Sequence, residues 1–170
     1  METIEKNTIE ALKTEIAHLR SESYKEAQKG NTNESILLAK KALDSSQALY
    51  DICNNPNEGE IQLATSYYDL SQSYSLHGDH LKALQYSNLV INLRIQRLKK
   101  SLDHNALIDL AISFRGRAKV YKRMGFIELA AFDQITRKNI EMLLSVEESS
   151  LKEAVYALLG SCKLADKLKI

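Results

Sequence analysis

The sequence predicts an all-α protein built from repeated helix–turn–helix units. Three glycines, Gly30, Gly78 and Gly125, recur at spacings of 48 and 47 residues, and a fixed period is typical of repeat architectures. Apolar residues on both sides of each glycine lie three or four apart, which places them on one face of a helix. The 170 residues include only six glycines and one proline, so the frequent tight turns of an all-β fold are not available.

The first unit is expected to contain helices at residues 3–29 and 33–53, on either side of Gly30. Asn31 and Glu34 have the spacing of a capping box at the start of the second of these helices. Polar turn formers around the only proline, Pro56, are expected to end the unit.

Two further units of the same plan follow, with helices expected at 59–77, 80–101, 104–124 and 127–148. Asp79 and Asp103 each precede a helix and are expected to cap it. A last helix, 150–167, is expected to begin with a capping box of Ser150 and Glu153. The chain is therefore interpreted as a single helical domain, 1–170, with repeat units at about 3–53, 59–101 and 104–148.

The residues around Gly78 and Gly125 resemble the tetratricopeptide repeat. The second unit matches the family's aromatic, leucine and small positions at Tyr67, Leu70, Ser71, Tyr74 and Ala83. The third unit matches at Phe114, Ala118, Tyr121, Gly125 and Ala130. The first unit matches at Gly30, Ser35, Ala39 and Ala42, without the aromatic signature of the first helix. The resemblance covers about residues 16–144.

Two features depart from the common form of the repeat. The period exceeds the usual ~34 residues, so the helices are longer, and the units are similar to the extended repeats of kinesin light chains and many bacterial tetratricopeptide proteins. Arg117 occupies a position where the family usually has a buried leucine. The resemblance implies a right-handed superhelical solenoid of three helix pairs, with the 150–167 helix as a cap over its apolar end.

The resemblance also implies where a partner would bind. In this family the first helix of each pair lines a concave groove, and its residues outside the packing positions contact the partner. By position these are Arg20, Tyr24, Gln28, Tyr68, Gln72, Ser75, Arg115, Lys119 and Lys122. The implied function is a protein–protein interaction module, such as an adaptor, a scaffold or a chaperone-like protein, that binds a peptide or helix of a partner protein.

The charge distribution indicates the character of that partner. Residues 93–138 contain 11 Lys and Arg against 4 Asp and Glu, whereas the net charge of the whole chain is +1. A positive region of this kind favours an acidic segment of the partner. Two alternatives stay open: nucleic-acid binding through the basic stretch 94–138, and a structural homo-oligomer such as a homodimer.

The motifs of catalysis are not recognisable in the sequence. A Gly-rich phosphate loop, H-E-x-x-H and G-x-S-x-G are all missing, so we expect no enzyme, no catalytic residue and no cofactor. His77 and His80 flank Gly78 without a third candidate ligand nearby, so no metal site is expected. Neither a membrane span of ~18 apolar residues nor the pattern of a secretory signal is recognisable. We therefore expect a cytoplasmic protein that does not bind membranes, with export by a system that reads no such signal left open.

Overall fold

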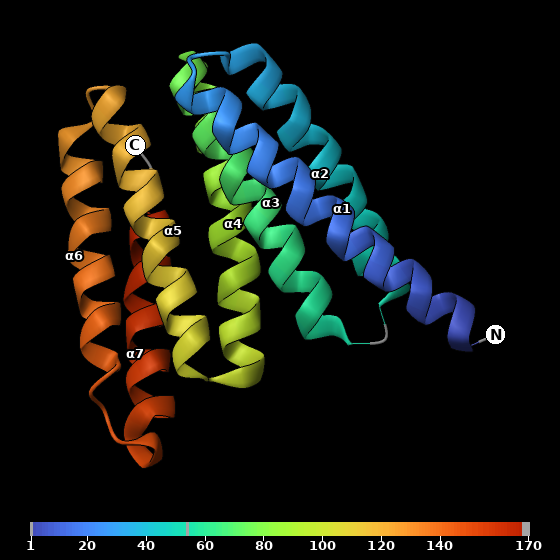
Figure 1. Ribbon diagram of the computed structural model, residues 1–170. Coiled ribbons are helices and arrows are strands. Elements are labelled where there is room, and N and C mark those ends of the chain that lie inside the picture. Colours follow the sequence, from blue (N-terminus) through green and yellow to red (C-terminus); the bar gives the residue numbers. More distant parts are fainter. Residues whose placement is uncertain (1, 54, 168–170) are drawn as a thin grey trace. The chain divides into compact units, whose positions relative to one another are not determined.

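Helices are the only regular secondary structure in the computed structural model, which describes residues 2–53 and 55–167 (Figure 1). The all-helical class expected from the sequence is confirmed for these residues, and each of the seven expected helices is present. Their bounds are α1 Glu2–Gln28, α2 Thr32–Ile52, α3 Pro56–His77, α4 His80–Ser101, α5 His104–Arg123, α6 Ile127–Leu143 and α7 Glu148–Lys167.

The chain divides into two compact units, which differ from the three expected repeats: the first unit comprises residues 1–93 and the second unit residues 94–170. The division falls inside α4. In the first unit α2 packs against both α1 and α3. In the second unit α6 packs against both α5 and α7. Helices that follow one another in sequence are thus packing neighbours, as expected for helix–turn–helix units. The single domain over 1–170 and the right-handed solenoid stay predictions.

Two helix ends differ clearly from those expected. α3 begins at Pro56 rather than at residue 59. The side-chain oxygen of Asn55 caps this start by accepting a hydrogen bond from the Asn57 amide. Proline also fits the first helical turn, because the N–H that it lacks would have no partner within the helix there. α6 ends at Leu143 rather than at residue 148. There the Ser145 hydroxyl donates to the Met142 carbonyl, which satisfies one of the last carbonyls of the helix.

The expected N-caps are partly confirmed. The side chains of Asp79 and Asp103 accept hydrogen bonds from the amides of Lys82 and Ala106, at 3.1 Å and 2.7 Å. The capping box of Asn31 is wrong, because its side-chain amide donates instead to the Glu26 carboxylate at 2.6 Å. The capping box at Ser150 and Glu153 is also wrong, since α7 begins earlier, at Glu148.

The three periodic glycines occupy the turns between paired helices. Gly30, Gly78 and Gly125 have φ angles of 83°, 94° and 81°, a left-handed conformation that glycine adopts without the steric cost of a Cβ atom. The turns predicted from the 48- and 47-residue spacings are therefore confirmed.

Buried serines join the helices of the first unit. The Ser23 hydroxyl on α1 donates to the Ser35 carbonyl on α2 at 2.8 Å, and the Ser35 hydroxyl lies 2.9 Å from that of Ser73 on α3. Two more hydroxyl pairs, each at 2.7 Å, join α2 to α3 and α3 to α4: Ser46 with Ser66, and Ser71 with Ser87. Small side chains allow the helices to approach closely, and each buried hydroxyl has a partner.

The core of the second unit is mainly aliphatic. Its buried apolar side chains include Leu98 on α4, Leu107, Leu110, Phe114 and Val120 on α5, Ile140 on α6, and Leu151 and Val155 on α7. The apolar face of α7 is thus in contact with the rest of the unit, and its role as the cap of a solenoid stays a prediction.

Candidate interaction site

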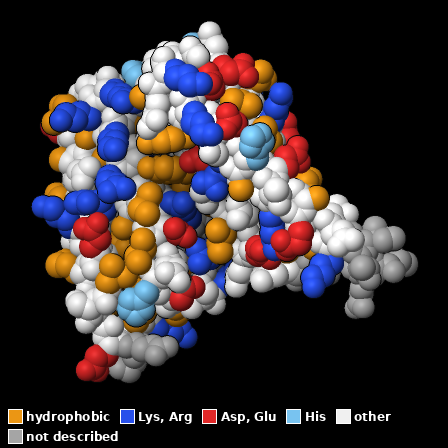
Figure 2. Space-filling model, in the orientation of Figure 1, with side chains coloured by type: hydrophobic (Ala, Val, Ile, Leu, Met, Phe, Trp, Pro, Cys, Tyr) orange, Lys and Arg blue, Asp and Glu red, His pale blue; other side chains and the backbone are white. Residues whose placement is uncertain are grey.

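Three cations form a stripe along the exposed side of α5. Arg115, Lys119 and Lys122 follow one another at spacings of four and three residues, and all three side chains are exposed. Within the part of unit 94–170 that the structure describes, none of the three side chains takes part in an ion pair or a hydrogen bond. We call these three residues the basic stripe. Figure 2 shows Lys and Arg side chains gathered over the region in which α5 and α6 lie in Figure 1.

The other side of α5 fixes the helix in its unit. Leu107, Leu110, Phe114 and Ala118 are buried there, on the faces that α6 and the rest of the unit cover. Because these apolar residues supply the packing, the charges of the basic stripe are not needed to hold α5 in place. Within the described part of this unit, the three charges are therefore exposed and take part in no ion pair that holds the helix.

Arg117, in contrast, is an internal cation of the α5–α6 pair. Its Nε and Nη2 atoms each donate a 2.8 Å hydrogen bond to the carboxylate of Asp133. Its guanidinium carbon lies 5.3 Å from the centre of the Phe114 ring and 5.6 Å from that of Tyr121, within the range of cation–π attraction. A carboxylate and two aromatic rings therefore accommodate the charge at a position where the sequence resemblance led us to expect a buried leucine.

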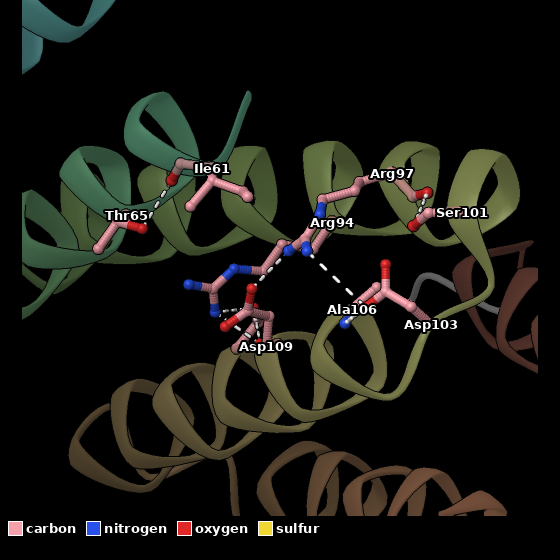
Figure 3. A network of polar contacts seen from close by, with 9 residues as sticks. Ile61, Thr65, Arg94, Arg97, Ser101, Asp103, Ala106 and Asp109 are labelled. Carbon is pink, nitrogen blue, oxygen red and sulfur yellow. Dashed lines mark hydrogen bonds and ion pairs between the residues drawn. The ribbon is translucent and has the colours of Figure 1, made fainter. Parts of the chain in front are cut away.

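Two arginines of α4 are used internally as well (Figure 3). Arg94 and Arg97 are both buried. Arg94 donates to the Asp109 carbonyl at 2.6 Å and to the Ser113 hydroxyl at 2.8 Å, and Arg97 forms a 2.6 Å ion pair with the Asp109 carboxylate. Part of the positive charge of the basic stretch 94–138, namely that of Arg94, Arg97 and Arg117, is therefore used in contacts within the fold.

Asp103 completes this network at the start of α5 (Figure 3). Burial acts to raise the pKa of its carboxyl, but hydrogen bonds from Ser101 and from the Ala106 amide, with the charge of Arg97, hold that pKa below its ordinary value. The carboxylate is thus kept ionised at the N-terminus of α5, where a negative charge stabilises the helix.

The three predicted contact residues on α1 have unequal environments. Tyr24, which is 66% exposed, and Gln28 are both exposed side chains of α1. Arg20 is half-buried, and its Nε atom lies 2.5 Å from the carboxylate of Asp69 on α3. Arg20 therefore joins α1 to α3, a role that its position in the repeat did not indicate.

The remaining three predicted residues lie on α3 and are less accessible. Tyr68 and Gln72 are half-buried. Ser75 is only 4% exposed, so its side chain does not belong to an accessible contact surface. The resemblance placed it beside Tyr68 and Gln72, but a position in a repeat cannot specify how closely neighbouring side chains cover a small residue.

Two isoleucines that extend the basic stripe were not among the predicted contacts. Ile108 is 44% exposed and Ile112 is half-buried, and they continue the four-and-three spacing of the basic stripe toward the start of α5. Their four-and-three spacing from Arg115 is the signal in the sequence that could have found them. Apolar residues at the end of a row of cations suit a partner segment that combines acidic and apolar side chains.

Among the described residues, no group of three or more His, Cys, Asp or Glu side chains is arranged to hold a metal ion. His77 instead has a structural partner, since its Nδ1 atom lies 3.0 Å from the Thr32 hydroxyl. None of the described helices is long and apolar enough to cross a membrane.

The fold and the surface define an all-helical protein made of sequentially packed helices, with a row of exposed cations on α5. No protein-family model matches the sequence. Comparison with curated proteins and with solved structures gives no match either.

Proposed function

We propose that this chain is a non-enzymatic protein-interaction module of the tetratricopeptide type, with extended repeats that form a right-handed solenoid. Its proposed task is to bind an acidic segment of a partner protein, as an adaptor, scaffold or chaperone-like protein does. The burial of Leu70, Ser71 and Ala83 in the second repeat, and of Phe114 and Ala118 in the third, supports the repeat assignment, because these are packing positions of the family.

The observation that carries the binding proposal is the basic stripe. Its three cations are exposed and without side-chain partners in the described part of the second unit. Other arginines of the same unit, such as Arg97 and Arg117, are paired with carboxylates. Arginine and lysine side chains in a row along a helix fit a partner that presents carboxylates at similar spacing.

The test is selection from a display library of natural protein segments, with the full chain as bait. We expect the selected segments to be rich in Asp and Glu. A synthetic peptide of the best segment should lose about tenfold or more in affinity for the variant Arg115→Glu/Lys119→Glu. The matched control is Lys41→Glu/Lys152→Glu, which reverses two exposed charges elsewhere and should bind like the wild type.

A single-stranded RNA probe and a duplex DNA probe accompany the peptide in the same assay. Selection of segments without acidic character, or equal peptide affinity of wild type and the Arg115→Glu/Lys119→Glu variant, contradicts the proposal. Nucleic-acid binding that exceeds peptide binding and falls steeply with added salt would replace the proposal with the nucleic-acid alternative.

A further inference from the structure

A second surface of the same unit, on α6, is apolar rather than basic. Phe132, Ile135 and Met142 are 39%, 59% and 62% exposed, and Ala131 is exposed as well. Their spacing places them on one side of the helix, while Ala130, Asp133, Thr136 and Ile140 are buried on the other side. We call Ala131, Phe132, Ile135 and Met142 the apolar stripe. An exposed row of large apolar side chains is typical of an interface.

Two opposite charges border the central part of the apolar stripe. Glu128 precedes Ala131 by three residues, and Lys138 follows Ile135 by three residues. Both side chains are exposed, and within the described residues neither has an ion-pair or hydrogen-bond partner. At 1.5 Å per residue, the two charges are about 15 Å apart along the helix axis.

The row of charged and apolar residues on α6 is complementary to a second copy of itself that runs in the opposite direction. If a second α6 lies antiparallel to the first, Glu128 of each copy meets Lys138 of the other, and Ile135 of each copy packs against the small Ala131 of the other. Glu128 and Ile135 are seven residues apart, as are Ala131 and Lys138, so all four contacts fall on one seam of the helix. A parallel arrangement would instead place like charges opposite each other, which is unfavourable.

We propose that the apolar stripe is the interface between two copies of this chain, paired through antiparallel α6 helices about a twofold axis. Such an interface uses the same residues in both copies. The pairing is independent of the proposed function, which rests on α5. Charge complementarity selects a second copy as the occupant, because one chain supplies both halves of each ion pair.

The test measures the molar mass of the full chain by sedimentation equilibrium over a range of concentrations. The wild type is expected to show a concentration-dependent monomer–dimer equilibrium. Ile135→Asp is expected to be monomeric throughout, and because Ile135 is mostly exposed, the helical circular dichroism spectrum should not change. The control Tyr24→Asp changes a similarly exposed residue of α1 and should dimerise like the wild type.

Charge reversal tests the orientation of the helices. Glu128→Lys and Lys138→Glu, made singly, should each raise the dimer dissociation constant about tenfold or more, because two like-charge contacts are created per dimer. The double variant Glu128→Lys/Lys138→Glu should recover the wild-type dissociation constant. A wild type that is monomeric at every concentration, a dimer that persists in Ile135→Asp, or a double variant that does not recover would overturn the proposal.

Discussion

Arg117 on α5 and Asp133 on α6 form a two-pronged ion pair in which both hydrogen bonds measure 2.8 Å. Asp133 is only 1% exposed. A buried ion pair fixes the register of two helices, because neither charge can move away from the other without losing its partner. Together with the apolar packing of α5, this contact therefore sets the α5–α6 pairing and the direction in which the basic stripe faces.

Removal of one member of the pair should therefore be costly. We expect Asp133→Ala or Arg117→Ala to lower the free energy of unfolding by about 3–5 kcal/mol, since each leaves the other charge without its partner. The joint replacement Arg117→Met/Asp133→Val should be much less harmful, because apolar side chains replace both charges. Urea denaturation of the three variants measures these differences, and a double variant as unstable as either single one would contradict this account.

A glycine inside α3 allows a close helix contact. A Cβ atom at Gly59 would lie 2.9 Å from the Cα atom of Tyr50 on α2, whereas one at Gly160 on α7 would meet no atom within 4 Å. We expect Gly59→Ala to destabilise the protein by about 1–3 kcal/mol. Gly160→Ala should stabilise it by about 0.5–1 kcal/mol, through helix propensity alone. Thermal unfolding of both variants checks the prediction, which fails if the two shifts have the same sign.

Ala83 lies where α3 and α4 approach each other, and the Ser71 hydroxyl donates to its carbonyl at 2.9 Å. The side chain is 0% exposed. Ala83→Leu should therefore separate the helices and cost about 1–3 kcal/mol of unfolding free energy. Gln85→Leu, two residues away and exposed, is the control and should have little effect. Equal stability of the two variants in chemical denaturation would show that the contact tolerates a larger side chain.

Asp103 should make the stability of the protein depend on pH. Its pKa in the folded state lies below the ordinary value of 3.8, so its ionised form stabilises the fold above that value, and the benefit is lost as the pH falls through the folded-state pKa. Asp103→Asn keeps an acceptor for the Ala106 amide but does not titrate. We expect the stability difference between wild type and variant to be constant near neutral pH and to shrink below about pH 4. A difference that does not vary with pH would contradict this role of the carboxylate.

The contact of α7 with its unit is testable at two adjacent residues. Val155 is buried and Tyr156 is 49% exposed. Val155→Asp should cost about 3–5 kcal/mol, because it buries a charge without a partner, whereas Tyr156→Asp should change stability by less than about 0.5 kcal/mol. Circular dichroism during chemical and thermal unfolding measures both changes in stability, and light scattering during heating records any aggregation. Similar melting curves for the two variants would mean that α7 does not cover an apolar surface.

The sequence predicts the helices well because each depends on local signals. The turn glycines follow from their spacing, and Asp79 and Asp103 follow from the preference of aspartate for N-caps. Asn31 fails as a cap because its amide has a better partner in the side chain of Glu26, a competition that residue types do not specify. Arg117 shows the same limit, since its partner Asp133 is sixteen residues away on the next helix, where only the packing of α5 against α6 brings them together.

The site is predicted less completely than the helices. The exposed positions of Arg115, Lys119 and Lys122 follow from the same periodicity that places Phe114 and Ala118 in the core. The burial of Ser75 and the pairing of Arg20 with Asp69 do not follow from periodicity, because both depend on side chains of other helices.

The serine contacts of the first unit have a direction. Ser23 has a single hydroxyl proton, which it donates to the Ser35 carbonyl, so at its contact with the Ser35 hydroxyl, 3.2 Å away, it can only accept. If the Ser35 hydroxyl donates to Ser23, the Ser35 oxygen can accept the hydroxyl proton of Ser73. The protons are then ordered one way, from α3 through α2 to α1 and back to the main chain of α2. The three serines of this chain are therefore not equivalent. Loss of the Ser73 hydroxyl removes only the first donor. Loss of the Ser23 hydroxyl removes the link between the Ser35 hydroxyl and the Ser35 carbonyl, which is the last acceptor.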